Sequence, residues 1–185
     1  MTKLSLANLP IISKTLRVPS YNRADLKPGI LHFGVGNFHR AHLAVYLDDL
    51  FNKGLNHDWA LIGTGVMDHD EKVRTTLATQ DFLTTVVEQD NELSSAHITG
   101  AMIDFISPHN KPEILAKLAD PTIRIVSMTV TEGGYFIDPA TQKFDAANPA
   151  IATVLNVIIG NRVVTFPNLE TLKAHQNFRA VLVVP

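Results

Sequence analysis

Residues 29–42, Gly29-Ile30-Leu31-His32-Phe33-Gly34-Val35-Gly36-Asn37-Phe38-His39-Arg40-Ala41-His42, decide the fold of this 185-residue chain. The mostly apolar run 30–34 leads into two glycines spaced G-x-G, and the amphipathic segment 43–53 follows at once. Apolar residues recur in that segment at intervals of three and four, which is typical of a helix packed on a core. The stretch therefore predicts a strand, a tight glycine turn and a helix.

The turn has the chemistry that a nucleotide pyrophosphate requires. Glycine lets the backbone turn sharply and approach a ligand, and a helix N-terminus offers unpaired N–H groups. Arg40 adds a planar partner for a phosphate oxygen. The full dinucleotide fingerprint would place a third glycine at position 39, where this chain has His39, so we expect the helix to stand off the strand or to begin differently. One alternative to a pyrophosphate site is a purely structural turn, because glycine pairs often separate a strand from a helix. Another alternative is a binding site for S-adenosylmethionine.

Two strings carry a resemblance to a known family. GVGNFHRAH, followed by LAVYLDDL, resembles the cofactor-binding signature of the mannitol dehydrogenase family, the polyol-specific long-chain dehydrogenases. Residues 124–135, which end in T-E-G-G-Y, resemble the second signature of that family. The similarity runs from about residue 16 to about residue 150, with Asn37 where many members have glycine. It implies an NAD-dependent oxidoreductase of the mannitol 2-dehydrogenase or fructuronate reductase type, which transfers hydride between NAD and a sugar alcohol or sugar acid.

The resemblance also implies three groups of cofactor-binding residues. The first group is the turn itself: Gly34, Val35, Gly36, Asn37, Phe38, His39 and Arg40. The second is Asp70, which aligns with the acidic residue that accepts hydrogen bonds from the adenosine ribose, with Asp68 as the next candidate. The third is Thr131 with Glu132, expected near the nicotinamide half. The alternatives are a solvated charged loop at 68–70 and a plain Gly-Gly turn after Glu132.

The histidines and the absence of cysteine bear on metal and thiol chemistry. His39 and His42 lie three residues apart, but two ligands do not close a metal site and no third ligand recurs at a convincing spacing. A place for His39 and Arg40 in the pyrophosphate turn explains them more simply. The chain has no cysteine, which excludes disulfides and thiol nucleophiles.

Composition indicates a cytoplasmic globular protein. Hydrophobic residues make up 45% of the chain and the formal net charge is −2, so we expect no nucleic-acid or membrane partner. Residues 1–10 do not resemble a secretory signal, and no apolar run is long enough to span a membrane.

The order of elements predicts an α/β fold, a Rossmann-like, doubly wound, mainly parallel sheet in an incomplete chain. We expect an irregular lead-in at 1–28, a dinucleotide-binding domain at 29–150 and an atypical tail at 151–185. The expected strands after the first are 59–66, 82–89, 96–106 with a break at Gly100, and 122–130; short helices are expected from 68 and from 111.

The tail and the missing chemistry predict a fragment. The chain stops at residue 185 directly after an apolar run, and segment 151–159 fits either a strand or a buried helix. By resemblance, longer family members continue into a helical domain with a catalytic lysine and its asparagine and histidine partners, and no such motif occurs here. We therefore assign no catalytic residue and expect a polyol substrate only when a second domain is supplied. The alternative is a non-catalytic NAD-binding module that is native at this length.

Overall fold

The structure is a computed structural model that describes residues 2–90, 94–129, 137–138, 140–145, 156–159 and 162–165. The chain divides into two compact units, Met1–Thr129 and Val130–Pro185. In the second unit, two antiparallel pairs are described: β7 (Ile137–Asp138) with β8 (Lys143–Phe144), and β9 (Asn156–Ile159) with β10 (Arg162–Thr165). The remaining elements belong to the first unit.

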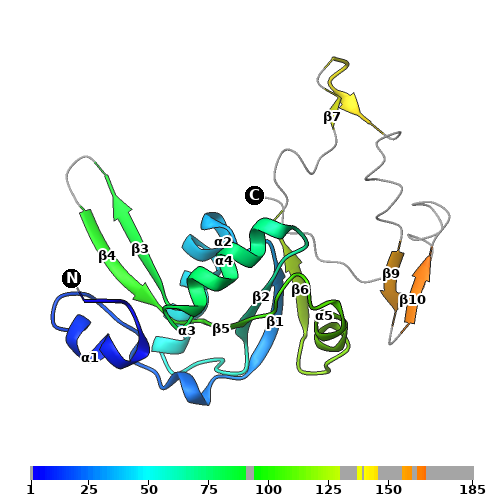
Figure 1. Cartoon of the computed structure of the whole chain (residues 1–185). Coiled ribbons are helices and arrows are strands. Elements are labelled where there is room, and N and C mark those ends of the chain that lie inside the picture. Colours follow the sequence, from blue (N-terminus) through cyan, green and yellow to red (C-terminus); the bar gives the residue numbers. More distant parts are fainter. Residues whose placement is uncertain are drawn as a thin grey trace. The chain divides into compact units, whose positions relative to one another are not determined.

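A four-stranded parallel sheet lies at the centre of the first unit, in the order β5-β2-β1-β6 (Figure 1). Its strands are β1 (Pro28–Phe33), β2 (Ala60–Thr64), β5 (Met102–Phe105) and β6 (Ile125–Met128). After β1 the chain adds β2 and then β5 on one side, and it later returns to place β6 on the other side. The strand order therefore reverses between β1 and β6, the topological switch point of a doubly wound sheet. The predicted Rossmann-like fold class is confirmed.

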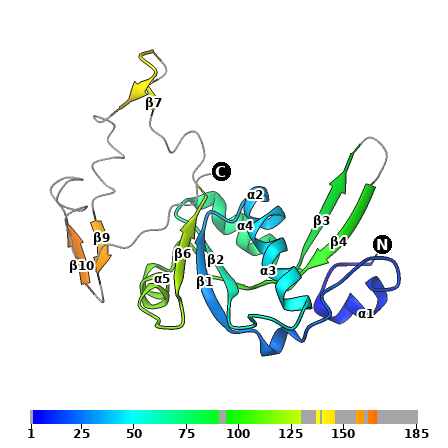
Figure 2. The ribbon, with the colours of Figure 1, turned by 180° about the vertical axis from the view of Figure 1, so that it is seen from behind.

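Helices cover both faces of this sheet. They are α2 (Asn37–Ala41), α3 (Leu43–Asn52), α4 (Asp68–Ala78) and α5 (Lys111–Leu118). The lead-in holds α1 (Leu9–Ile12) and the short 3-10 helices η1 (Leu6–Asn8) and η2 (Arg23–Asp25), none of which contributes a buried residue. Ile30 of β1 joins a core cluster with α3 and α4, whereas its neighbour Leu31 joins a second cluster with α5. Figures 1 and 2 show α5 on the opposite side of β1 from α3. Because both faces are covered, β1 is a continuous apolar run and not an alternating one. No helix of the described residues is long and apolar enough to cross a membrane.

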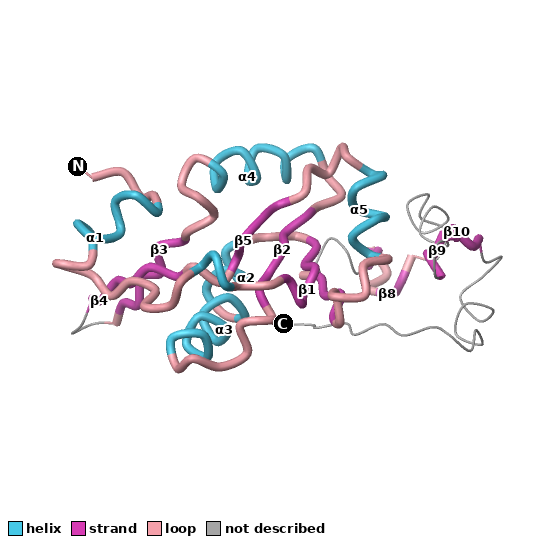
Figure 3. The backbone as a smooth tube through the Cα atoms, turned by 90° about the horizontal axis from the view of Figure 1, so that it is seen from below, coloured by secondary structure: helices cyan, strands magenta, loops and turns pink. Residues whose placement is uncertain are grey.

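Two elements differ from the sequence prediction. The predicted break at Gly100 within 96–106 is present, but the part before it lies outside the main sheet: β4 (Ser94–Thr99) forms an antiparallel hairpin with β3 (Thr84–Gln89), and only β5 enters the main sheet. Figure 3 shows this hairpin beside the four-stranded sheet. The helix after the glycine turn is also divided, since α2 ends at Ala41 and α3 begins at Leu43, with His42 at φ −122° and ψ −87° between them.

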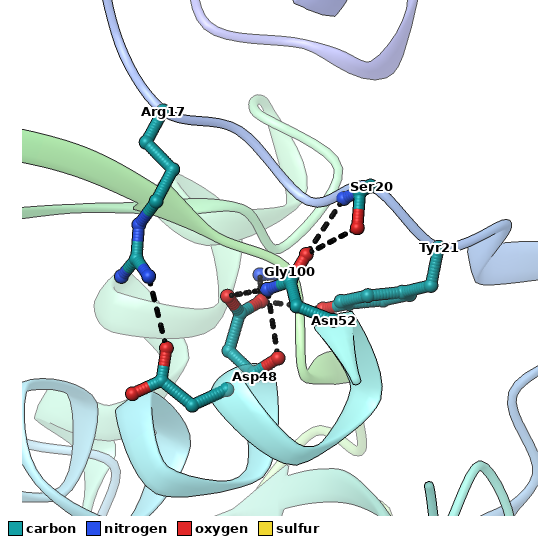
Figure 4. Close-up of polar contacts among 7 residues, drawn as sticks. Arg17, Ser20, Tyr21, Asp48, Asn52 and Gly100 are labelled. Carbon is teal, nitrogen blue, oxygen red and sulfur yellow. Dashed lines mark hydrogen bonds and ion pairs between the residues drawn. The ribbon is translucent and has the colours of Figure 1, made fainter. Parts of the chain in front are cut away.

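A buried network of hydrogen bonds connects the end of the lead-in, at Ser20 and Tyr21, to α3 (Figure 4). Asp48, only 1% exposed, accepts hydrogen bonds from the Tyr21 hydroxyl at 2.5 Å, the Gly100 N–H at 2.8 Å and the Asn52 amide at 2.8 Å. Burial raises the pKa of the Asp48 carboxyl. The Asn52 amide oxygen in turn accepts the N–H and the hydroxyl of Ser20, both at 2.8 Å. These bonds hold the lead-in, α3 and the turn between β4 and β5 together.

Candidate functional site

Gly34 begins the turn at the carboxyl end of β1, beside the switch point. Its N–H donates to the Thr64 carbonyl at 3.0 Å, and its φ of +82° lies in the left-handed region. A Cβ at this position would lie 3.4 Å from the Thr129 carbonyl oxygen, just after β6. Glycine is required here because the backbone passes between two neighbouring strands with a positive φ.

Gly36 is open to the outside, whereas Val35 is buried. A Cβ built on Gly36 would meet nothing within 4 Å, and the residue caps α2 with an ordinary φ of −86°. Val35 is 2% exposed and lies against β2, where its Cγ2 would be 2.7 Å from a Cβ on Gly63. Gly36 therefore leaves free space at the edge where parallel α/β sheets bind ligands.

Arg40 of α2 stabilises the turn through two hydrogen bonds. Its Nε donates to the Gly36 carbonyl at 3.2 Å and its Nη2 donates to Asn37 Oδ1 at 2.5 Å. Burial lowers the pKa of the guanidinium, which remains a cation at any physiological pH. Phe38 is 42% exposed, and its ring centroid lies 4.4 Å from that of His42.

Two stacked histidines lie beneath the turn. The rings of His32 on β1 and His39 on α2 are 3.6 Å apart and inclined by 12°. His32 is anchored to the end of β6 through Ser127 Oγ at 2.9 Å and Thr129 Oγ1 at 3.1 Å. His39 is 2% exposed, and neither ring nitrogen has a hydrogen-bond partner in the part of the chain that the structure describes.

Both imidazoles are neutral in this environment. Burial lowers the pKa of His32 to about 4. Burial, and secondly the adjacent His32 and Arg40, lower the pKa of His39 to about 3. His42 lies against Phe38 and not against His39, and the described residues contain no group of three or more side chains suited to a metal ion.

The carboxylates after β2 differ sharply in their surroundings. Asp70 is 6% exposed, and its Oδ2 accepts the N–H groups of Val66 at 3.1 Å and Met67 at 3.0 Å. A Cβ on Gly65 would overlap this carboxylate, so the glycine lets Asp70 fold back onto the turn. The Asp68 side chain is fully exposed, with its Oδ1 3.9 Å from His109 Nδ1 in the loop after β5.

A cavity of about 330 Å³ lies between α2 and α4. It is lined by Arg40, His69, Lys72, Val73, Thr76 and Leu77. Arg40, His69 and Lys72 are its basic lining residues, and His69 Nε2 lies 3.6 Å from Asp70 Oδ1.

The structure brings together Gly34, Gly36, Arg40 and the turn that Asp70 holds, all at the carboxyl edge of the sheet. Thr131 and Glu132 lie outside the described residues. Three further residues were not predicted from the sequence: His32, Ser127 and Thr129, which link β1 to β6 beneath the turn. The sequence did contain a signal for His32, because it is a histidine within an apolar strand.

Comparisons with known proteins agree with this geometry. A model of the mannitol dehydrogenase Rossmann domain matches residues 28–172. Mannitol 2-dehydrogenase of Cereibacter sphaeroides is 50% identical over 141 residues, which are 76% of this chain and 29% of that protein. The Pyricularia oryzae mannitol 2-dehydrogenase is 42% identical over 154 residues, 80% of this chain and 31% of the relative.

Solved structures show the same relationship. The Pseudomonas fluorescens mannitol 2-dehydrogenase, in a ternary complex with NAD and D-mannitol, aligns with a TM-score of 0.71 and 42% identity, over 80% of this chain and 30% of that one. A D-sorbitol dehydrogenase in substrate-free form aligns with a TM-score of 0.69 and 37% identity, over 83% of this chain and 32% of the other. This chain thus spans less than a third of either protein. On its sequence, its switch-point turn and its fold, the chain belongs to the mannitol dehydrogenase family, within which it corresponds to the Rossmann domain.

Proposed function

We propose that this chain binds NAD at the carboxyl edge of its parallel sheet, as the cofactor-binding part of an oxidoreductase acting on a sugar alcohol or sugar acid. The observation that carries the proposal is the turn Gly34-Val35-Gly36 at the switch point, with open space over Gly36. A relative of known structure, 42% identical, is complexed with NAD and D-mannitol.

In this proposal the turn receives the pyrophosphate. Gly36 allows the phosphates to approach the backbone, and the first N–H groups of α2 have no partners within the helix. Because α2 has only five residues, these N–H groups contribute more to binding the phosphates than the dipole of the helix does. Arg40 keeps Asn37 and the Gly36 carbonyl in place and adds positive charge beside the phosphates. Val35, Phe38 and His39 support the turn by packing.

The adenosine ribose lies against the end of β2 in this proposal. Asp70 Oδ2 fixes the turn 65–67, and its Oδ1 is the proposed acceptor for a ribose hydroxyl. Exposed Asp68 is the second candidate. Thr131 and Glu132, which follow β6 in sequence, keep their proposed role at the nicotinamide half.

Bound NAD supplies the hydride acceptor. The residues of this chain bind and orient it, because the turn fixes the pyrophosphate and the β2 edge fixes the ribose. Transfer from a secondary alcohol also needs a group that takes the hydroxyl proton, and we assign no residue of this chain to that role.

Isothermal titration of the 185-residue chain tests the proposal. NAD should bind with one site per chain, and ADP-ribose, which retains the pyrophosphate and the ribose of the adenosine half, should bind within about tenfold of NAD. S-adenosylmethionine should not bind, because it has no pyrophosphate for the turn to hold. Binding of S-adenosylmethionine without binding of NAD would refute the proposal.

A further inference from the structure

The ring of His32 connects β1 to the end of β6. In the parallel register His32 lies opposite Ser127, and Thr129 follows two residues later on the same face of the sheet. The ring reaches both side chains, with Nδ1 2.9 Å from Ser127 Oγ and Nε2 3.1 Å from Thr129 Oγ1. Because burial keeps the ring neutral, one ring nitrogen donates and the other accepts, and the two hydroxyls supply the complementary groups.

The His39 ring holds the His32 ring from the side of α2. The two rings are stacked with their centroids 3.6 Å apart. Neither ring nitrogen of His39 has a hydrogen-bond partner among the described residues, so His39 fixes its neighbour by packing alone. At 4% exposure, His32 is too buried to contact a bound ligand itself. The pair therefore joins α2, which follows the glycine turn, to the end of β6.

The end of β6 has few other supports in the part of the chain that the structure describes. There β6 is the last strand of the sheet and pairs with β1 alone (Figure 1). The Thr129 N–H donates to the Phe33 carbonyl at 3.1 Å, just beyond the strand. On the opposite face of β6, Val126 and Met128 are 37% and 41% exposed. The two bonds of His32 therefore hold a strand end that has a neighbouring strand on one side.

The order of the strands indicates which part of a dinucleotide meets the end of β6. The proposed function places the adenosine ribose at the end of β2 and the pyrophosphate at the turn after β1. Since the strands run β5-β2-β1-β6, a dinucleotide extended along this edge continues from β1 to β6. Thr129 lies beside the turn, with its carbonyl oxygen 3.4 Å from a Cβ built on Gly34. The nicotinamide half is then the part that reaches Thr129.

We infer that His32 is a positioning residue for the nicotinamide half of the cofactor. By holding Ser127 and Thr129, it fixes the end of β6 on which the nicotinamide rests, and it does not touch the ring itself. This inference rests on the proposed function, from which it takes the direction of the dinucleotide. The adenosine half and the pyrophosphate do not depend on these two hydrogen bonds.

The fluorescence anisotropy of NADH bound to the 185-residue chain tests the inference, because the emission comes from the dihydronicotinamide ring. A ring held at the end of β6 tumbles with the protein and has a high anisotropy at saturation, as we expect for wild type. His32→Phe, which keeps a ring against His39 but cannot bond the hydroxyls, should lower the anisotropy of the bound cofactor. Thr129→Val should lower it as well, whereas Thr129→Ser, which retains the hydroxyl, should keep the wild-type value. A loss of stability alone would reduce the number of binding sites and not the anisotropy of each bound cofactor.

Isothermal titration with ADP-ribose, which has no nicotinamide, separates the two halves of the site. In His32→Phe the affinity for NADH should fall by about fivefold, the size of one ordinary hydrogen bond, whereas that for ADP-ribose should stay within about twofold. Thr99→Val is the matched control, because it removes a buried hydroxyl of β4, three residues before the amino end of β5. It should change neither affinity nor the anisotropy.

Four results would overturn the inference. A low anisotropy of NADH bound to wild type would show that the ring is not held. An unchanged anisotropy in His32→Phe, or in Thr129→Val where His32→Phe does not fold, would show that the ring is held without these contacts. Equal losses in Thr129→Ser and Thr129→Val would exclude the hydroxyl, and equal weakening of NADH and ADP-ribose in His32→Phe would place its effect at the turn. A wild-type chain that binds neither ligand would refute the proposed function as well, whereas any of the four results with ADP-ribose bound refutes this inference alone.

Discussion

The stacked His32–His39 pair predicts a strong acid sensitivity of the fold. Burial holds the pKa of His32 at about 4 and that of His39 at about 3, whereas an unfolded histidine titrates near 6.5. A group whose folded pKa is lowered stabilises the fold fully above its unfolded pKa and loses that contribution as the pH falls. Between pH 6.5 and about 4, the unfolded chain therefore gains protons that the folded chain does not bind.

The size of the effect follows from the width of this window. Each histidine costs about 1.4 kcal/mol per pH unit below 6.5, so at pH 5 each lowers the free energy of unfolding by about 2 kcal/mol and the pair by about 4 kcal/mol. Urea unfolding at pH 7.5 and pH 5 measures the drop. In His39→Phe, which retains a ring against His32 but cannot be protonated, the drop should be smaller by about 2 kcal/mol.

Comparing the drop within each protein cancels any change of packing that the phenyl ring causes at both pH values. Lys53→Ala, which removes an exposed side chain that does not change its charge between pH 7.5 and pH 5, is the control and should retain the wild-type drop. An equal drop in His39→Phe and in wild type would refute the view that His39 is buried as a neutral ring.

The remaining predictions concern the buried network and the β2 edge. Asp48→Ala should lower the free energy of unfolding by about 2–5 kcal/mol, because it leaves the Tyr21 hydroxyl and the Gly100 N–H without an acceptor. Asp49→Ala, an exposed change on the same helix, should cost at most about 1 kcal/mol in the same urea titration. Asp70→Ala should lower stability by about 0.5–2 kcal/mol through loss of its two N–H bonds. Calorimetry of the same Asp70→Ala variant should show NAD binding weakened by about 1–3 kcal/mol and a smaller difference in affinity between NAD and NADP. Equal losses for both cofactors would exclude Asp70 as the ribose partner, and weaker NAD binding in Asp68→Ala with unchanged stability would favour Asp68.

The sequence predicted the central part of the fold because its signals there are local. The turn that follows β1 needs a residue with positive φ, which Gly34 supplies. The alternation of apolar strands with helices predicts a parallel sheet. The amphipathic pattern correctly predicted a helix from Leu43, but the separate helix α2 before it was not predicted because residues 37–41 do not carry that pattern. A contact of α2 that the sequence could not reveal is the stacking of the His39 ring on His32 of a separate strand.

The hairpin was missed for a similar reason. The chain turns at Gly100, where the N–H donates to Asp48 at 2.8 Å and the carbonyl accepts Arg23 Nε at 2.9 Å. Both partners are more than 50 residues away in the sequence. In the candidate site, too, local signals could be predicted and distant contacts could not. The glycine turn was predicted from the sequence, whereas the orientation of Asp70 depends on the absence of a side chain at Gly65.

The most direct test of the cofactor site is the affinity of Gly36→Val for NAD. The φ of −86° and the open space around Gly36 let valine fit without strain, so its urea unfolding should match wild type within about 0.5 kcal/mol. The added methyl groups would occupy the space proposed for the pyrophosphate. We therefore expect a folded variant with no calorimetrically detectable NAD binding. A folded Gly36→Val chain that binds NAD as tightly as wild type would contradict it.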